Sequence, residues 1–151
     1  GKVISMDVEQ WKLDECKKRA ARAGAQNIET RLITDKVLAD LKGKADLLLL
    51  DVPCSGTGVI RRNPDTKWKL SKTGLEQIRE NQQKLIQEYS VLVKPGGKLI
   101  YSTCSIFPSE NKRIIETFLK HDQGFRFIKE RTLLPSGGTD GFYMAELVKK
   151  N

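Results

Sequence analysis

The sequence predicts an α/β fold with a mostly parallel sheet and an antiparallel closing strand. Strand-like apolar segments alternate with amphipathic helical segments, which is the order that builds a sheet covered by helices. The run ADLLLL, Ala45 to Leu50, is uninterrupted and apolar, as in a strand covered on both faces of a parallel sheet. The 151 residues are 38% hydrophobic and contain no repeat or linker, so we expect one domain, residues 1–151, with a real core.

The first elements are a strand, a helix and a second strand. KVISMD predicts a short strand that ends at Asp7. From Val8 to about Ala23, apolar residues recur at steps of three and four, which indicates a helix, and Gly24 is a typical helix stop. NIETRLI predicts the second strand.

The second half adds two helices and three further strands. A helix is expected from about Ser71 to Val93, with Thr73 and Glu76 as a capping box. KPGG predicts a turn before the strand KLIYSTC, and Ser109 is expected to cap the next helix. FRFIKE and GFYMAELVKK predict two closing strands. The apolar stripe expected on the first of these helices is Leu75, Ile78, Leu85, Ile86, Tyr89 and Leu92.

Composition limits the classes of function. The net charge is +8, which favours a polyanionic partner, nucleic acid before membrane, although a lysine-rich solubilising surface is the alternative. Three cysteines and one histidine match no zinc pattern, so no metal is expected. The first residues do not resemble a signal peptide and no apolar run is long enough to span a membrane, so we expect a cytoplasmic location.

Reactive side chains follow the predicted strands at their carboxyl ends. Asp51 ends LLLLD with Cys54 three residues on, and Cys104 ends LIYSTC. Ligands collect beyond the carboxyl ends of parallel strands, so these residues are expected to form one site with two thiols and a carboxylate. The alternative for a free cysteine is a small buried hydrophobe, which is our interpretation of Cys16 on its apolar helix face. SGTG after Cys54 lacks the lysine of a phosphate-binding loop and is read as a turn.

The motif DVPCSGTGVIRRNPD, joined to YSTCS, resembles the RNA cytosine-5 methyltransferases, the group that includes the bacterial ribosomal RNA enzyme Sun or Fmu. The similarity continues through LVKPGGKLIYSTCSIFPSENKRIIETFL and ends in GTDGFYMAELVK, in the family's order along essentially the whole chain. The resemblance implies a Rossmann-like class I methyltransferase fold, S-adenosyl-L-methionine as the cofactor and RNA as the partner.

The resemblance also implies catalytic roles. Cys104, the Thr-Cys cysteine, would add to C6 of cytosine and make C5 nucleophilic. Cys54, the Pro-Cys cysteine, would assist breakdown of the covalent adduct. Asp51 would hydrogen-bond near N3 and the exocyclic amine of the base.

Basic residues follow the Pro-Cys motif. Arg61, Arg62 and Lys67 are candidates for RNA phosphate contacts, for simple solvation or for lowering the pKa of a thiol, a task that a cationic cofactor could share. Trp68 could stack on a base, but core packing is the preferred interpretation.

For the cofactor, the resemblance implies that Asp7 binds the ribose hydroxyls and Asp35 touches the adenine amine. Asp51 and Pro53 would lie where its methyl end meets the base. The family's glycine-rich cofactor loop and first strand, which should precede KVISMD, have no counterpart here. We therefore expect a carboxy-terminal portion of the methyltransferase domain that, in isolation, binds S-adenosylmethionine poorly and turns over little or not at all.

Other functions stay open at this point. One is a noncatalytic RNA-binding remnant of the same fold. Another is a methyltransferase that acts on transfer RNA instead of the ribosomal RNA favoured here, and a third acts on an amine, which would not require the thiol of DVPC. The sequence gives no oligomeric state and does not identify the modified cytosine.

Overall fold

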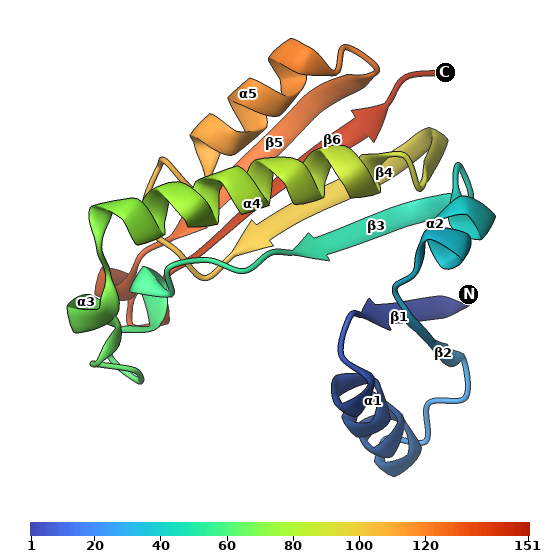
Figure 1. Cartoon of the computed structure of the whole chain (residues 1–151), viewed down its shortest axis with the longest axis horizontal. Coiled ribbons are helices and arrows are strands. Elements are labelled where there is room, and N and C mark those ends of the chain that lie inside the picture. The colour runs from blue at the N-terminus through green and yellow to red at the C-terminus, as the bar shows by residue number, and fades with distance from the viewer. The chain divides into compact units, whose positions relative to one another are not determined.

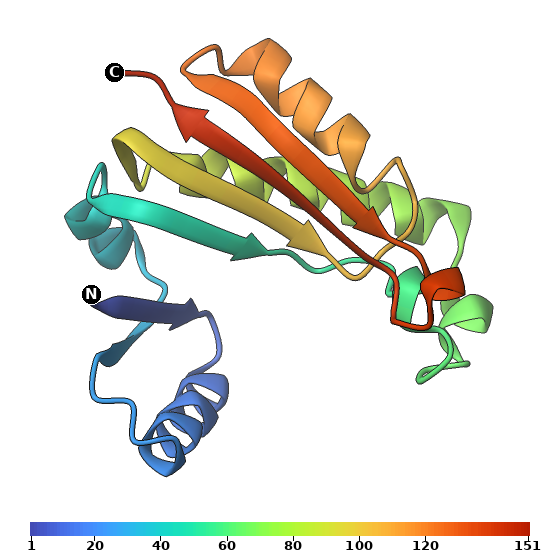
Figure 2. The same cartoon turned by 180° about the vertical axis from the view of Figure 1, so that it is seen from behind.

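The computed structural model describes all 151 residues, which form two compact units. Gly1–Lys42 is the amino-terminal unit and Gly43–Asn151 the carboxy-terminal unit. Figures 1 and 2 show the elements of both.

The amino-terminal unit is a two-stranded parallel sheet with two helices. β1 (Val3–Asp7) pairs with β2 (Ile28–Leu32), so that Asp7 stands opposite Leu32 at the carboxyl edge. α1 (Gln10–Arg22) connects the strands, and α2 (Asp35–Leu41) follows β2. The predicted strand–helix–strand order is confirmed here. Gly24, with a φ of +66°, adopts the left-handed conformation expected just beyond a helix end.

The carboxy-terminal unit contains one four-stranded sheet. Its elements are β3 (Ala45–Asp51), the 3-10 turn η1 (Thr57–Val59), α3 (Thr66–Lys69), α4 (Lys72–Ser90), β4 (Val93–Thr103), α5 (Lys112–His121), β5 (Phe125–Leu133), the 3-10 turn η2 (Pro135–Gly137) and β6 (Phe142–Lys149). The strand order is β3-β4-β6-β5. β3 runs parallel to β4, whereas β6 is antiparallel to both of its neighbours. Only the closing strand therefore runs in the opposite direction, and the predicted fold class is confirmed.

Both long helices of this unit cover the same face of the sheet, which lies in front of them in Figure 2. The buried residues between them and the strands form the core: Val52, Ile86, Val93, Leu99, Tyr101, Ile114, Ile115, Phe118, Phe125, Tyr143, Ala145 and Leu147. On the opposite face, Leu47 and Leu49 of β3 are 56% and 62% exposed. The expectation that the apolar run is covered on both faces is therefore wrong.

Two helix caps also differ from the sequence prediction. Ser71, not Thr73, caps α4, because its hydroxyl accepts the N–H of Gly74 at 3.0 Å. α5 begins after Asn111, so Ser109 is not its cap. No helix in the structure combines the length and the hydrophobicity that crossing a membrane requires.

Candidate active site

The parallel pairing of β3 with β4 brings their carboxyl ends to one edge of the sheet. Asp51, the last residue of β3, stands opposite Ser102 of β4. The Ser102 hydroxyl donates to Asp51 Oδ1 at 3.3 Å, while the rest of the exposed carboxylate is accessible. Cys54 follows β3 by three residues and Cys104 follows β4 directly. Each motif thus emerges at the edge where a parallel sheet places its ligands.

The two cysteines that lie fifty positions apart meet at this edge. Their Sγ atoms are 3.0 Å apart, and both side chains are free thiols of intermediate exposure. The predicted convergence of Cys54 and Cys104 is therefore confirmed as geometry. Cys16, in the amino-terminal unit, is also a half-buried free thiol, and its Sγ lies 3.6 Å from the Ser5 hydroxyl.

The environment of Cys54 opposes ionisation. Burial and the neighbouring Cys104 thiol raise the pKa of Cys54 to about 12, from an ordinary value of 9.0. Arg61, Arg62 and Lys67 are not among the causes that set the pKa of Cys54. At neutral pH this residue is a protonated thiol, which can donate a proton but is a poor nucleophile.

The loop after Cys54 is locked to two other loops through Gly58. Its N–H donates to the Cys104 carbonyl at 2.8 Å, and its own carbonyl accepts the N–H of Gly141 at 2.8 Å. A Cβ on Gly58 would lie 2.1 Å from the Gly141 carbonyl oxygen and 2.7 Å from that of Cys104. Position 58 therefore requires glycine because three backbones meet there.

A buried polar network, which the sequence reasoning missed, lies behind the two cysteines. Glu110 is fully buried and accepts hydrogen bonds from Ser55, Ser105 and Gln82. Two signals were available in the sequence. Ser55 and Ser105 each follow a motif cysteine, and Gln82 interrupts the apolar stripe of α4 at helical spacing.

The basic residues after the Pro-Cys motif are exposed. The Arg62 guanidinium is paired with Asp140, whereas Arg61 and Lys67 form no ion pair in the structure. The Lys67 ammonium lies 4.8 Å from the ring centroid of Trp68, a cation–π contact. Trp68 is 80% exposed, so the interpretation that it packs in the core is wrong. This segment presents positive charge and one aromatic face to solvent.

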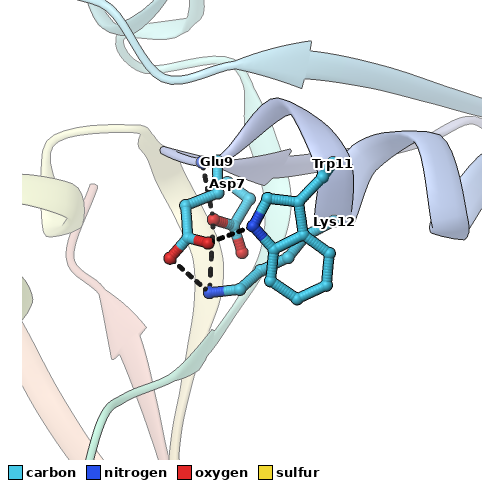
Figure 3. Close-up of polar contacts among 4 residues, drawn as sticks. All are labelled: Asp7, Glu9, Trp11 and Lys12. Carbon is cyan, nitrogen blue, oxygen red and sulfur yellow. Dashed lines mark hydrogen bonds and ion pairs between the residues drawn. The ribbon is translucent and has the colours of Figure 1, made fainter.

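In the amino-terminal unit, Asp7 lies at the carboxyl end of β1. Figure 3 shows its carboxylate with the side chains of Glu9, Trp11 and Lys12. Asp7 Oδ1 accepts the backbone N–H of Glu9 at 2.9 Å and lies 3.8 Å from the Lys12 ammonium. The ammonium is bound mainly by Glu9, at 3.0 Å, and the Trp11 indole also donates to Glu9. The structure shows no hydrogen bond to Asp7 Oδ2, which leaves that oxygen for a hydroxyl donor.

Asp35 lies beyond the same edge of the two-stranded sheet as Asp7. It is the first residue of α2, exposed, and preceded by the cap residue Thr34, whose hydroxyl accepts the N–H of Val37 at 3.2 Å. The carbonyl of Asp7 accepts the N–H of Ile33 at 3.0 Å, which holds the two strand ends together. These two carboxylates therefore fit the polar half of a nucleoside cofactor.

The fold is that of an S-adenosylmethionine-dependent methyltransferase. The structure of PH0851 superposes with a TM-score of 0.90 at 30% identity, over 99% of this chain and 37% of that one. The structure of NSun6 from Pyrococcus horikoshii with SFG superposes with a TM-score of 0.86 at 25% identity, over 100% of this chain and 42% of that one.

Residues 1–148 match the model of the 16S rRNA methyltransferase RsmB/F family, and the chain belongs to this family. S-adenosylmethionine is the cofactor of the family. One curated relative, the ribosomal RNA small subunit methyltransferase B of Yersinia enterocolitica, is 32% identical over 98% of this chain and 37% of its own length. The chain thus spans a little over a third of that relative. The resemblance inferred from the Pro-Cys and Thr-Cys motifs is confirmed at the level of the family.

Proposed function

We propose that this chain carries the catalytic thiol pair of an RNA cytosine-5 methyltransferase, with ribosomal RNA as the substrate class. The observation that supports the proposal most is the 3.0 Å separation of the Cys54 and Cys104 sulfurs beside Asp51. Two thiols at one strand edge suit a reaction that forms and then breaks a covalent bond to a base, because one can attack while the other assists release. A methyl transfer to an amine requires neither.

In the proposed mechanism Cys104 is the nucleophile. Its thiolate adds to C6 of a flipped-out cytosine, and electron density moves to C5. Asp51 is exposed and accepts the Ser102 hydroxyl at one oxygen. It hydrogen-bonds near N3 and the exocyclic amine of the base, where it stabilises positive charge or supplies a proton as the adduct forms. When bound, S-adenosylmethionine supplies an electrophilic methyl group.

Cys54 acts in the second half of the reaction. After methylation, solvent accepts the proton from C5, the C–H electron pair re-forms the C5–C6 double bond, and the Cys104 sulfur leaves C6 as a thiolate, which restores the aromatic ring. A thiol with a pKa of about 12 stays protonated beside the departing sulfur, where it can donate a hydrogen bond to the developing thiolate.

The cofactor and RNA contacts complete the proposal. Asp7 and Asp35 would hold the ribose hydroxyls and the adenine amine, and Asp51 and Pro53 would lie near the methyl group. Arg61, Arg62 and Lys67 would contact RNA phosphates. The family match over residues 1–148 supports the view that both units belong to one methyltransferase domain.

The test is capture of a covalent RNA adduct. RNA containing 5-fluorocytosine is incubated with S-adenosylmethionine and either this chain or a chimera in which it replaces the matched segment of the Yersinia relative. Fluorine at C5 blocks the proton loss, so the adduct persists. We expect Cys104→Ala to abolish it, whereas Cys54→Ala accumulates adduct on ordinary RNA. No adduct in either sample, as a noncatalytic RNA-binding protein would give, or a reversal of the two variants, contradicts the proposal.

A further inference from the structure

The two cysteine loops converge on one buried carboxylate. Glu110 lies in the segment between β4 and α5, and it is fully buried with no cation bound to it. Removing an ionised carboxylate from water is costly unless hydrogen-bond donors replace the water. Four donors do so here, two to each oxygen.

The donors come from both cysteine motifs. Glu110 Oε1 accepts the hydroxyls of Ser55 and Ser105, at 2.5 and 2.7 Å. Glu110 Oε2 accepts the backbone N–H of Ser55 at 2.8 Å and the Gln82 amide at 3.2 Å. Ser55 directly follows Cys54, and Ser105 directly follows Cys104. One side chain therefore fixes the residue next to each thiol.

Helix α4 completes the attachment through Gln82. The same amide nitrogen that donates to Glu110 also donates to the Pro53 carbonyl at 2.9 Å. Pro53 precedes Cys54, so the Pro-Cys turn is held on both sides of its thiol. On the Thr-Cys side, Asn111 donates to the Ser105 carbonyl at 2.8 Å and accepts the Thr103 hydroxyl at 2.6 Å.

We propose that Glu110 is a positioning residue that sets the separation of the two thiols. This inference rests on the proposed function, because the separation matters for a reaction in which one thiol acts on the adduct of the other. Glu110 is fully buried, so it acts on the thiols through Ser55, Ser105 and Gln82. A carboxylate suits the role because it accepts at both oxygens, and its charge-assisted bonds are about twice as strong as neutral ones.

The thiol separation can be measured in this chain without RNA or cofactor. In a glutathione buffer, oxidised glutathione takes two electrons from the Cys54 and Cys104 thiols. One protein S–S bond forms, and two reduced glutathione molecules carry away the two protons. The equilibrium constant is an effective concentration for the pair, and it falls when the sulfurs drift apart. Cys16→Ser is made in every sample so that only this pair reports.

We expect Glu110→Ala to lower the effective concentration of the thiol pair by about tenfold or more. Glu110→Gln keeps the shape of the side chain but weakens its hydrogen bonds, so its effective concentration should lie between those of the alanine variant and the parent chain. Tyr143→Phe is the matched control, because it removes a part-buried hydroxyl bond to Glu130, 2.6 Å long, from the same sheet and leaves the four hydrogen bonds of Glu110 intact. It should lower the urea midpoint but leave the effective concentration within about twofold.

The outcomes separate this inference from the proposed function. Effective concentrations within about twofold of the parent in folded Glu110→Gln and Glu110→Ala overturn the positioning role. So does a parent chain that keeps both thiols reduced in strongly oxidising glutathione. If Glu110→Ala does not fold, Glu110→Gln alone decides. If the parent chain forms the disulfide readily but never forms an RNA adduct, the proposed function is contradicted. The glutathione measurements on the Glu110 variants still test the positioning role in that case.

Discussion

Gly58→Ala tests whether the meeting of three loops sets the stability of the candidate site. The new Cβ would lie 2.1 Å from the Gly141 carbonyl oxygen, whereas real Cβ atoms essentially never approach a heavy atom within 3.0 Å. The loops must therefore separate by roughly 0.9 Å, and the atoms involved are backbone, which cannot rotate away. The separation strains or breaks the two hydrogen bonds of Gly58, to Cys104 and Gly141.

The expected cost follows from these contacts. Overpacking costs about 1–3 kcal/mol, and each of the two hydrogen bonds contributes about 1 kcal/mol, so the free energy of unfolding should fall by about 3–5 kcal/mol. Urea unfolding followed by circular dichroism measures this change, and at a slope of about 1–3 kcal/mol per molar the midpoint falls by roughly 1–5 M. Gly137→Ala is the matched control, because nothing lies within 4 Å of its Cβ position and its φ is not positive. It should change stability by less than about 0.5 kcal/mol. Equal midpoints for the two variants would refute the reasoning.

Three further predictions concern individual side chains. The rate at which iodoacetamide alkylates Cys54, followed by peptide mass mapping, should keep rising beyond pH 10 because the pKa of Cys54 is about 12. Cys104→Ser should shift this profile to lower pH, and a plateau near pH 9 in the parent chain would contradict the prediction. Trp68→Ala should weaken RNA binding by about fivefold to a hundredfold in a filter assay while Trp68→Phe keeps most of the affinity, because an exposed ring can stack on a base; equal losses would exclude stacking. Ser71→Ala should cost about 1 kcal/mol in urea unfolding and Thr73→Ala much less, since only Ser71 caps α4; the reverse order would restore the predicted capping box.

Much of the fold was predictable because patterning and strand order are local signals. Most of the alternating strands and helices, the helix stop at Gly24 and the two closing strands were predicted correctly from the sequence. The segment after Leu92 was predicted as a turn before the next strand, and the structure places it within that strand. KPGG does interrupt the β3–β4 pairing, but as a bulge inside β4, in which four residues, Lys94 to Gly97, stand against the single residue Asp46.

The errors and omissions concern packing, which a linear pattern does not contain. Leu47 and Leu49 belong to an apolar run, yet that pattern does not say whether helices cover one face or two. Trp68 is large and apolar, so base rates favoured burial, but it lies on the short helix α3 with Lys67 and Lys69 beside it. α2, with seven residues, was missed because so short a helix gives little periodic signal.

The sequence predicted the reactive side chains of the candidate site but not the buried hydrogen-bond network around Glu110 that holds them. Strand-end position alone pointed to Asp51, Cys54 and Cys104, because topology carries distant motifs to one edge. Nothing comparable identifies Glu110, since a glutamate in SENK is by default an exposed helix-start residue. Its burial depends on contacts with residues 28 and 55 positions away.

The surroundings of Cys54 bear on the role proposed for it. Ser55 and Pro53, its two chain neighbours, are hydrogen-bonded to Glu110 and Gln82, and its own sulfur lies 3.0 Å from the Cys104 thiol in a site where burial is the main cause of its raised pKa. Such a site stabilises the neutral form, which favours proton donation over attack. A cation added beside Cys54 should therefore lower its pKa and turn it into a competing nucleophile. The more acidic the Cys54 thiol becomes, the more often a captured RNA adduct should map to Cys54 instead of Cys104, and mass mapping of adduct peptides can follow this shift.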